Sequence, residues 1–167
     1  MEQYVRARLA HRVLRDEIQR YREENEGPLL GRASEIFSRL CLGSFDALRV
    51  DYRDDVAVLV GERSDKSRTP VEGMSSGTRD QLYLALRLAA VERAIEKSEP
   101  LPFIVDDILV NFDDQRSKAT LEVLAELARK TQVVLFSHHN RAVELAQGVK
   151  GAAGVFVHQG WNGSIGS

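Results

Sequence analysis

The stretch from Leu101 to Asp114, LPFIVDDILVNFDD, limits the possible folds more than any other part of the chain. Its residues up to Val105 are rich in aromatic and β-branched types, which favours a short buried strand over a helix. The strand ends in Asp106 and Asp107, and side-chain alternation predicts that they point to opposite sides of it. Ligands of open α/β sheets bind outside the carboxyl ends of the strands. The stretch therefore predicts an α/β protein with a site at this strand end.

A second acidic pair, Asp113 and Asp114, follows after one short loop. This pair also has a structural interpretation, because acidic residues before a helix act as N-caps, and a helix is expected to begin near Gln115. Acidic pairs at strand ends also occur in solvated turns. The stretch alone leaves the catalytic and the structural interpretations open.

The whole chain has the size and composition of one soluble globular domain, with 167 residues, 43% of them hydrophobic and 29% charged. Its net charge of -2 gives no overall electrostatic signal for nucleic acid. The single cysteine, Cys41, cannot form an internal disulfide. No apolar run is long enough to span a membrane, and the N-terminus is charged from its second residue, which does not fit a signal peptide. We expect a cytoplasmic protein.

The segment from Met1 to Asn25 predicts a polar, locally basic helix. A weak apolar seam recurs along it at the alternating spacing of a coiled coil: Tyr4, Ala7, His11, Leu14, Ile18 and Tyr21. Its arginines are compatible with a solvated helix held by ion pairs at four-residue spacing, or with a nucleic-acid contact. A helix this polar needs a partner.

Pro28 can occupy the first turn of a second helix, which Gly43 would stop. Its core-facing stripe consists of Leu29, Leu30, Ala33, Ile36, Phe37 and Leu40. Two strand-like runs, Ala47 to Tyr52 and Val56 to Gly61, then predict a hairpin. The charged stretch from Glu62 to Arg68 is expected to be a loop.

The segment MSSGTRDQ, which starts at Met74, leads into a run that predicts a buried helix, since it is apolar nearly all round. Ser75 or Ser76 can cap this helix. Its start combines small residues, hydroxyl groups and the nearby Arg79, and free N–H groups at a helix N-terminus bind anions such as phosphate. An ordinary serine-capped helix is the structural alternative.

The C-terminal third continues the alternation of strands and helices. Helices are predicted over Arg116 to Lys130 and Arg141 to Gln147, and strands over Thr131 to Phe136 and Gly154 to His158. This alternation indicates a mainly parallel sheet with flanking helices. His138 follows the predicted strand from Thr131 to Phe136, so we expect it at the same sheet edge as Asp106 and Asp107. A histidine there is otherwise a surface or hydrogen-bonded residue.

Read in order, MSSGT, FIVDD, NFDD and FSHH resemble the signature motif, Walker B strand, D-loop and H-loop of ABC-type ATPases. The match is greatest to the SMC-like, RecN/RecF-like and double-strand-break-repair branch, particularly the YhaN-like ATPases. The resemblance covers about residues 29–147. It implies the C-terminal lobe of a P-loop NTPase head over residues 27–167, preceded by the end of a coiled-coil arm over residues 1–26.

The resemblance also implies roles for individual residues. Asp106 would hold Mg²⁺, and Asp107 would polarise the attacking water at a position where the family usually has Glu. His138 would contact the γ-phosphate of ATP, and Asp113 would be the D-loop acid at a dimer interface. The signature residues would be Ser75, Ser76, Gly77 and Thr78. Of these, Ser75 and the Gly77 backbone would clamp the γ-phosphate of nucleotide bound to an opposing subunit.

The chain departs from the family pattern in its signature, where Met74, Ser76 and Thr78 replace the commoner Leu, Gly and Gln or Glu. It also contains no GxxxxGK[ST] loop, the Walker A element that cradles phosphates. In coiled-coil heads that loop lies in an N-terminal lobe. The expected partners are therefore such a lobe and a second head, with DNA as a further candidate and no membrane, and the chain alone is expected to be inactive.

Two other functions fit the same residues. The chain could be a non-catalytic dimerisation or scaffold module derived from such a head. Alternatively, the four aspartates at positions 106, 107, 113 and 114 could hold metal ions in a Toprim-like nuclease. That second function needs a glutamate at an earlier strand end, where Glu62 enters a predicted loop.

Overall fold

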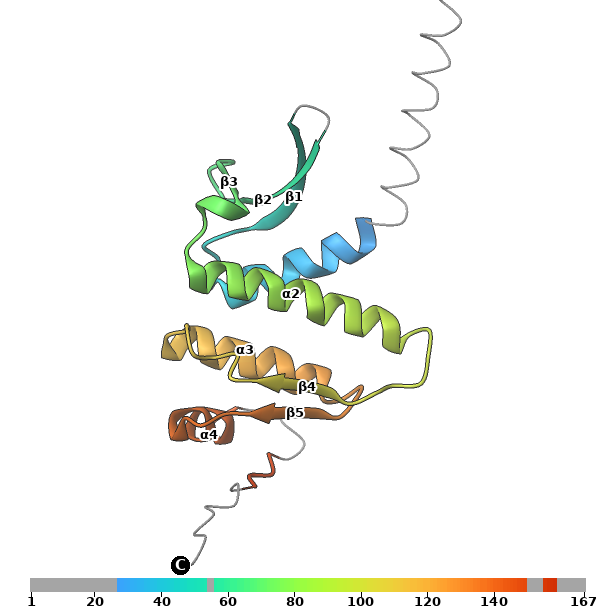
Figure 1. The fold of residues 1–167 in the computed structure, drawn as a ribbon, viewed down its shortest axis with the longest axis vertical. Helices are drawn as coiled ribbons and strands as arrows, with labels where there is room; N and C mark the ends of the chain where they lie inside the picture. The colour runs from blue at the N-terminus through green and yellow to red at the C-terminus, as the bar shows by residue number, and fades with distance from the viewer. Residues whose placement is uncertain (1–26, 54–55, 150–154, 159–167) are drawn as a thin grey trace, which may run out of the picture. The chain divides into compact units, whose positions relative to one another are not determined.

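The structure is a computed structural model that describes residues 27–53, 56–149 and 155–158 (Figure 1). The predicted coiled-coil helix of residues 1–25 lies outside the described residues. The chain divides into two compact units, and the division falls between Ser98 and Glu99. The first unit would carry the signature segment, and the second the Walker B, D-loop and H-loop segments.

The first unit combines a helix over residues 27–40 with an antiparallel sheet and the long helix α2, Ser76–Ile95. The sheet has the order β1-β2-β3, with β1 at Ala47–Arg53, β2 at Val56–Glu62 and β3 at Arg68–Pro70, and a 3-10 helix, η1, follows at Val71–Gly73. The predicted hairpin is therefore confirmed. The loop expected up to Arg68 ends in a third strand, which pairs Glu62 with Arg68.

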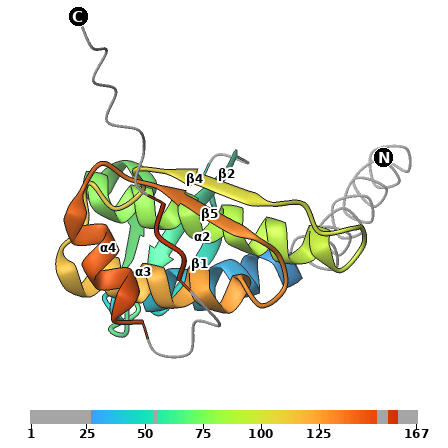
Figure 2. The same ribbon diagram turned by 90° about the horizontal axis from the view of Figure 1, so that it is seen from below.

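The core of the first unit lies along the helix over residues 27–40 and α2. The predicted stripe is buried at Ala33, Ile36, Phe37 and Leu40 and half-buried at Leu29 and Leu30. From α2, the most buried apolar side chains are Leu82, Ala85, Leu88 and Ala89. Figures 1 and 2 show these two helices side by side. The helix over residues 27–40 ends as predicted at a glycine in the left-handed region, because Gly43 has a φ of +76°.

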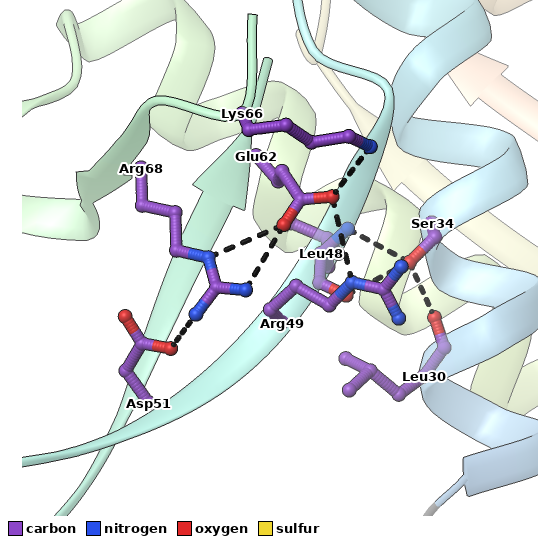
Figure 3. Close-up of polar contacts among 8 residues, drawn as sticks. All are labelled: Leu30, Ser34, Leu48, Arg49, Asp51, Glu62, Lys66 and Arg68. Carbon is purple, nitrogen blue, oxygen red and sulfur yellow. Dashed lines mark hydrogen bonds and ion pairs between the residues drawn. The ribbon is translucent and has the colours of Figure 1, made fainter. Parts of the chain in front are cut away.

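Glu62 lies almost completely buried at the end of β2, with a side chain that is 6% exposed (Figure 3). It accepts hydrogen bonds from Arg68 at 3.1 Å and Lys66 at 3.4 Å, and Arg49 lies 3.8 Å away. Burial raises the pKa of Glu62, but these cations outweigh it and leave the pKa below its ordinary value. The acid is thus fully compensated, which is the condition for burying a charge.

Ser34 joins the helix over residues 27–40 to β1 (Figure 3). Its hydroxyl donates to the Leu30 carbonyl at 2.8 Å and accepts from the Leu48 backbone N–H at 2.8 Å. One small side chain therefore fixes the start of the hairpin against the helix.

The second unit is a β-α-β-α unit. Strand β4, Phe103–Asp106, pairs in parallel with β5, Val133–Phe136, and helix α3, Asp114–Leu127, connects them. Helix α4, Asn140–Gln147, follows and contacts α3 (Figure 2). The α/β class and the parallel pairing are confirmed.

The predicted strand from Gly154 to His158 is wrong for its described part, since residues 155–158 form no strand. Phe156 is 84% exposed there. An apolar, β-branched run predicts a strand only if a neighbouring strand can pair with it, and within the described residues β5 pairs with β4 alone.

One face of the β4–β5 sheet exposes large apolar side chains. Ile104 is 63% exposed and Phe136 is 56% exposed. Ile104 pairs with Val134 and Asp106 with Phe136, so these side chains share one face. On the other face of β4, Val105 is buried. Parallel sheets normally have both faces covered, so this sheet is incomplete within the described residues.

Among the residues that the structure describes, no helix has both the length and the apolar character needed to cross a membrane.

Candidate functional site

Asp107 lies just beyond the end of β4, where the chain turns. Its backbone N–H donates to the Phe136 carbonyl of β5 at 2.9 Å, and its φ is +45°. The strand alternation expected for Asp106 and Asp107 does not extend to Asp107, because β4 ends at Asp106 and Asp107 has left the strand. Aspartate tolerates the left-handed region better than most residues. The short acid at this position suits the backbone that carries it.

His138, which follows β5, contacts Asp107 directly. The ring Nδ1 lies 2.6 Å from Asp107 Oδ2, and the His138 backbone N–H donates to Oδ1 at 3.3 Å. The hydrogen bond from His138 is the main cause that holds the pKa of Asp107 below its ordinary value. An ionised carboxylate only accepts hydrogen bonds, so Nδ1 carries the proton and Nε2 is left for another partner. The predicted meeting of these two residues at the carboxyl edge is confirmed.

Asp106 is the last residue of β4 and is exposed. It stands at the carboxyl end of the strand, on the same face as Ile104. Within the described residues, no group of three or more histidine, cysteine, aspartate or glutamate side chains is arranged to hold a metal ion. Asp106 can thus supply one oxygen ligand but not a complete metal site.

The second acidic pair has structural partners. Asp113 is the N-cap of α3, where its Oδ1 accepts from the Arg116 backbone N–H at 2.9 Å. Asp114 accepts from Arg141 at the start of α4, with Nη2 at 2.5 Å from Oδ2, and this contact lowers the pKa of Asp114. The structural interpretation of Asp113 as a cap is confirmed. Because Asp107 also has a separate partner, the four aspartates do not form the metal cluster that the nuclease hypothesis requires.

In the first unit, Ser75 is the N-cap of α2. Its hydroxyl accepts from the Thr78 backbone N–H at 3.2 Å and lies 2.9 Å from Thr78 Oγ1. Ser75 and Ser76 are exposed, whereas Gly77 and Thr78 are buried. The start of this 20-residue helix therefore carries two exposed serine residues, next to N–H groups that the helix itself cannot satisfy.

No protein-family model matches the chain. The uncharacterized protein YhaN of Bacillus subtilis (strain 168) is 32% identical over 136 residues, which are 81% of this chain and 14% of YhaN. The chain thus spans about one seventh of the length of this relative.

Several solved structures of SMC heads share the fold. One, from work on ATP-driven dimerization and DNA-stimulated activation of SMC ATPases, has a TM-score of 0.60 and 19% identity, and the match covers 74% of this chain and 75% of that one. An Smc head with a coiled coil and joint from Pyrococcus yayanosii has a TM-score of 0.59 and 17% identity over 87% of this chain and 29% of that one.

The chain has the fold of the C-terminal part of an SMC-like ATPase head. A third structure agrees, the Pyrococcus furiosus Smc head bound to the C-terminal domain of ScpA, with a TM-score of 0.58 and 20% identity. It is matched over 78% of this chain and 34% of its own length. The resemblance that the sequence motifs indicated is confirmed at the level of the fold.

Within this SMC-like fold, the site residues fall into two groups. Asp107 and His138 are brought into contact in the second unit, with Asp106 next in sequence to Asp107. The start of α2 belongs to the first unit. The convergence of Ser75 with the aspartates on one rim stays a prediction.

The sequence did not single out two residues of this fold. Arg141 joins the starts of α3 and α4 by bonding Asp114, and Gln81 is completely buried in α2. A glutamine on the apolar side of α2 was a visible signal, but no pattern in the sequence names its partners. The Asp114–Arg141 contact joins positions that are distant in sequence and gives no periodic signal.

Proposed function

We propose that this chain is the catalytic C-terminal lobe of an SMC-like head that binds and hydrolyses ATP as a dimer once an N-terminal lobe supplies GxxxxGK[ST]. The observation that carries the proposal is the Asp107–His138 contact at the carboxyl ends of β4 and β5, the sheet edge where α/β proteins bind ligands. The SMC ATPases with the same fold were studied for ATP-driven dimerization, which supports the dimeric form.

The residues at this edge fit a magnesium–triphosphate complex. Asp106 offers an exposed carboxylate, and carboxylate oxygens with water and phosphate are the ligands that Mg²⁺ prefers. His138 has a side chain that is 68% exposed, so its Nε2 is accessible. When bound, Mg²⁺ neutralises charge on the phosphate oxygens. We assign Asp106 to the metal and His138 to the γ-phosphate.

Asp107 is assigned to hold the attacking water. Its two oxygens contact the ring and the backbone of His138, but a carboxylate accepts about four hydrogen bonds. A water can therefore bond to Asp107 while His138 stays in place. The pKa of Asp107 lies below its ordinary value, so the group is ionised at neutral pH and can orient a water as a hydrogen-bond acceptor, although the same shift makes it a weaker base.

Ser75, Ser76, Gly77 and Thr78 are assigned to the γ-phosphate of nucleotide held by an opposing head. Support comes from the exposed serines and from the favourable field of a helix N-terminus for anions. Asp113 is assigned to the same dimer interface. Its role as N-cap of α3 uses Oδ1, and Arg116 Nε lies 3.6 Å from Oδ2, but the carboxylate is exposed and can accept from a further donor.

The exposed face of the β4–β5 sheet supports an N-terminal lobe as partner. Ile104 and Phe136 expose apolar surface that an element packed on this face would cover, and β4 has a paired strand on one edge alone within the described residues. We assign residues 1–26 to the end of the coiled-coil arm that connects the two lobes, and residues 27–167 to the lobe itself. We also propose that the assembled head acts on DNA in repair or chromosome maintenance.

The test uses a head completed with a GxxxxGK[ST] lobe, joined to this chain or added as a second polypeptide. Asp107→Asn is expected to lower ATP turnover about a hundredfold or more while ATP-driven dimerisation persists. Asparagine also tolerates a positive φ, so the backbone is kept. Asp46→Asn, at an exposed aspartate of the other unit, is the matched control and should leave turnover unchanged.

Each outcome separates the candidate functions. Unchanged turnover in Asp107→Asn would remove Asp107 from the mechanism. A wild-type head that dimerises with no hydrolysis would favour the scaffold module, and Mg²⁺-dependent nicking of plasmid DNA by the chain would favour a nuclease. Stimulation of turnover by duplex DNA is expected, and its absence would remove DNA from the proposal.

A further inference from the structure

Gln81 is a completely buried amide in α2, less than two helical turns after Ser75. Its Nε2 donates to the Leu40 carbonyl at 2.7 Å, and its Oε1 accepts from Cys41 Sγ at 3.2 Å. Burying an amide without partners costs free energy, so both bonds are needed for the side chain to stay inside. Both partners lie at the end of the other helix of this unit.

The Leu40 carbonyl depends on Gln81. The helix over residues 27–40 ends in a tight turn, in which backbone N–H groups donate to the carbonyls on either side of Leu40. These bonds are Cys41 to Phe37, Gly43 to Ser38, Leu42 to Arg39 and Ser44 to Cys41. Within the described residues, the Leu40 carbonyl accepts its hydrogen bond from the Gln81 side chain instead. Gln81 thus completes the C-terminal cap of that helix.

The same contact sets the rotation of α2 about its axis. Thr78 and Gln81 lie on the buried side of α2, while Ser75 and Ser76 are exposed. Successive residues of a helix are about 100° apart, so a turn of α2 by one residue would bring Gln81 out of the core and move both serines. The direction that Ser75 faces is therefore coupled to the bonds of Gln81.

We propose that Gln81 is a positioning residue for the start of α2. Through Leu40 and Cys41 it fixes the depth and rotation of α2, and with them the orientation of the Ser75 hydroxyl and the first N–H groups. The functional part of this inference rests on the proposed function, in which Ser75 meets the γ-phosphate. The structural part stands without it.

The far end of α2 provides a matched control. There Glu92 receives two hydrogen bonds from Arg32, from Nε at 2.6 Å and from Nη2 at 3.1 Å. This contact joins the same two helices, but it lies several turns away from Ser75. Arg32→Met therefore removes a polar link between the same two helices, here a part-buried ion pair, without touching the start of α2.

Hydrogen exchange of the full chain tests the structural part. Gln81→Met keeps the length of the side chain and removes both bonds, and Cys41→Ala is a milder variant that removes one. In Gln81→Met we expect exchange at residues 78–82 to become about tenfold faster, with residues 84–92 unchanged. Cys41→Ala should act in the same direction with a smaller effect. Arg32→Met should leave residues 78–82 as in the wild type.

Equal acceleration along all of α2 in Gln81→Met would show a purely structural role and overturn the proposal, as would unchanged exchange at residues 78–82. If Gln81→Met does not fold, unchanged exchange in Cys41→Ala decides against it in the same way.

In a completed head, Gln81→Met is expected to lower kcat about tenfold or more with KM for ATP within about twofold, because the nucleotide is held by the other lobe. An equal loss in Arg32→Met would overturn a positioning role. A wild-type head that never hydrolyses ATP would refute the proposed function and leave the exchange result intact.

Discussion

Substitution of Ser75 separates the capping role of this residue from its proposed role toward a triphosphate. Ser75→Ala removes the acceptor of the Thr78 N–H, a bond of 3.2 Å. Replacing a serine N-cap by alanine costs about 0.5–2 kcal/mol of unfolding free energy. Because this bond is long, we expect a loss of about 1 kcal/mol, in the lower half of that range. For a chain of this size that is a fall in Tm of about 2–4 °C.

Ser75→Asp and Ser75→Asn complete the design. Both side chains cap helices as well as serine does, so unfolding followed by circular dichroism should give a Tm at or near the wild-type value. The aspartate adds a negative charge where the γ-phosphate is expected, whereas the asparagine adds none. ATP-driven dimerisation of a completed head, followed by light scattering, should be abolished in Ser75→Asp and retained at least in part in Ser75→Asn.

Two results would refute this reasoning. Ser75→Asp heads that dimerise with ATP as readily as the wild type would show that Ser75 does not face a triphosphate. An unchanged Tm in Ser75→Ala would show that the cap adds nothing to stability, for example because the Thr78 hydroxyl, 2.9 Å from Ser75 Oγ, replaces it.

Two further predictions concern stability and acid response. Gly61→Ala should lower the unfolding free energy by about 1–3 kcal/mol in urea titrations, because a Cβ there would lie 2.6 Å from the Phe45 ring. Gly31→Ala should raise the unfolding free energy by up to about 1 kcal/mol, because a Cβ there meets no atom within 4 Å and alanine favours a helix over glycine. Equal effects at the two glycines would contradict the packing argument. Asp114 has its pKa lowered by a hydrogen bond from Arg141, so their contact stabilises the fold above the ordinary carboxyl pKa of about 3.9 and is lost as the pH falls through the folded value. Arg141→Gln should raise the pKa of Asp114, as measured by carboxyl NMR titration. The variant should have a lower unfolding free energy than the wild type near neutral pH, and this difference should become smaller below about pH 4. An unchanged pKa of Asp114 in the variant would contradict the assignment.

The sequence predicted those features that follow from local periodicity and from the geometry of parallel strands. His138 was expected at the same sheet edge as Asp107 because both follow strands whose carboxyl ends share that edge. The His138 ring does contact the Asp107 carboxylate there. The hairpin and the serine cap of α2 followed from turn and cap chemistry. These rules involve near neighbours in sequence or a known sheet edge.

The features that the sequence could not predict depend on partners that are distant in the chain. Asp107 still donates its N–H to the Phe136 carbonyl of β5 but has a positive φ, so the strand and its alternation stop one residue early. Gln81 is held by the end of another helix, which no helical pattern specifies. The run up to His158 has strand-like residues, yet its described part has no strand beside it.

Ile104 and Phe136 also have a consequence for how such a protein is made. A freshly synthesised chain carries these two side chains in contact with water until something covers them, and exposed apolar surface on a sheet promotes aggregation. Cells would need either rapid assembly or protection by chaperones during that interval. In the laboratory, replacing both residues by threonine should raise the soluble yield of the chain produced alone and weaken its binding to the proposed N-terminal lobe.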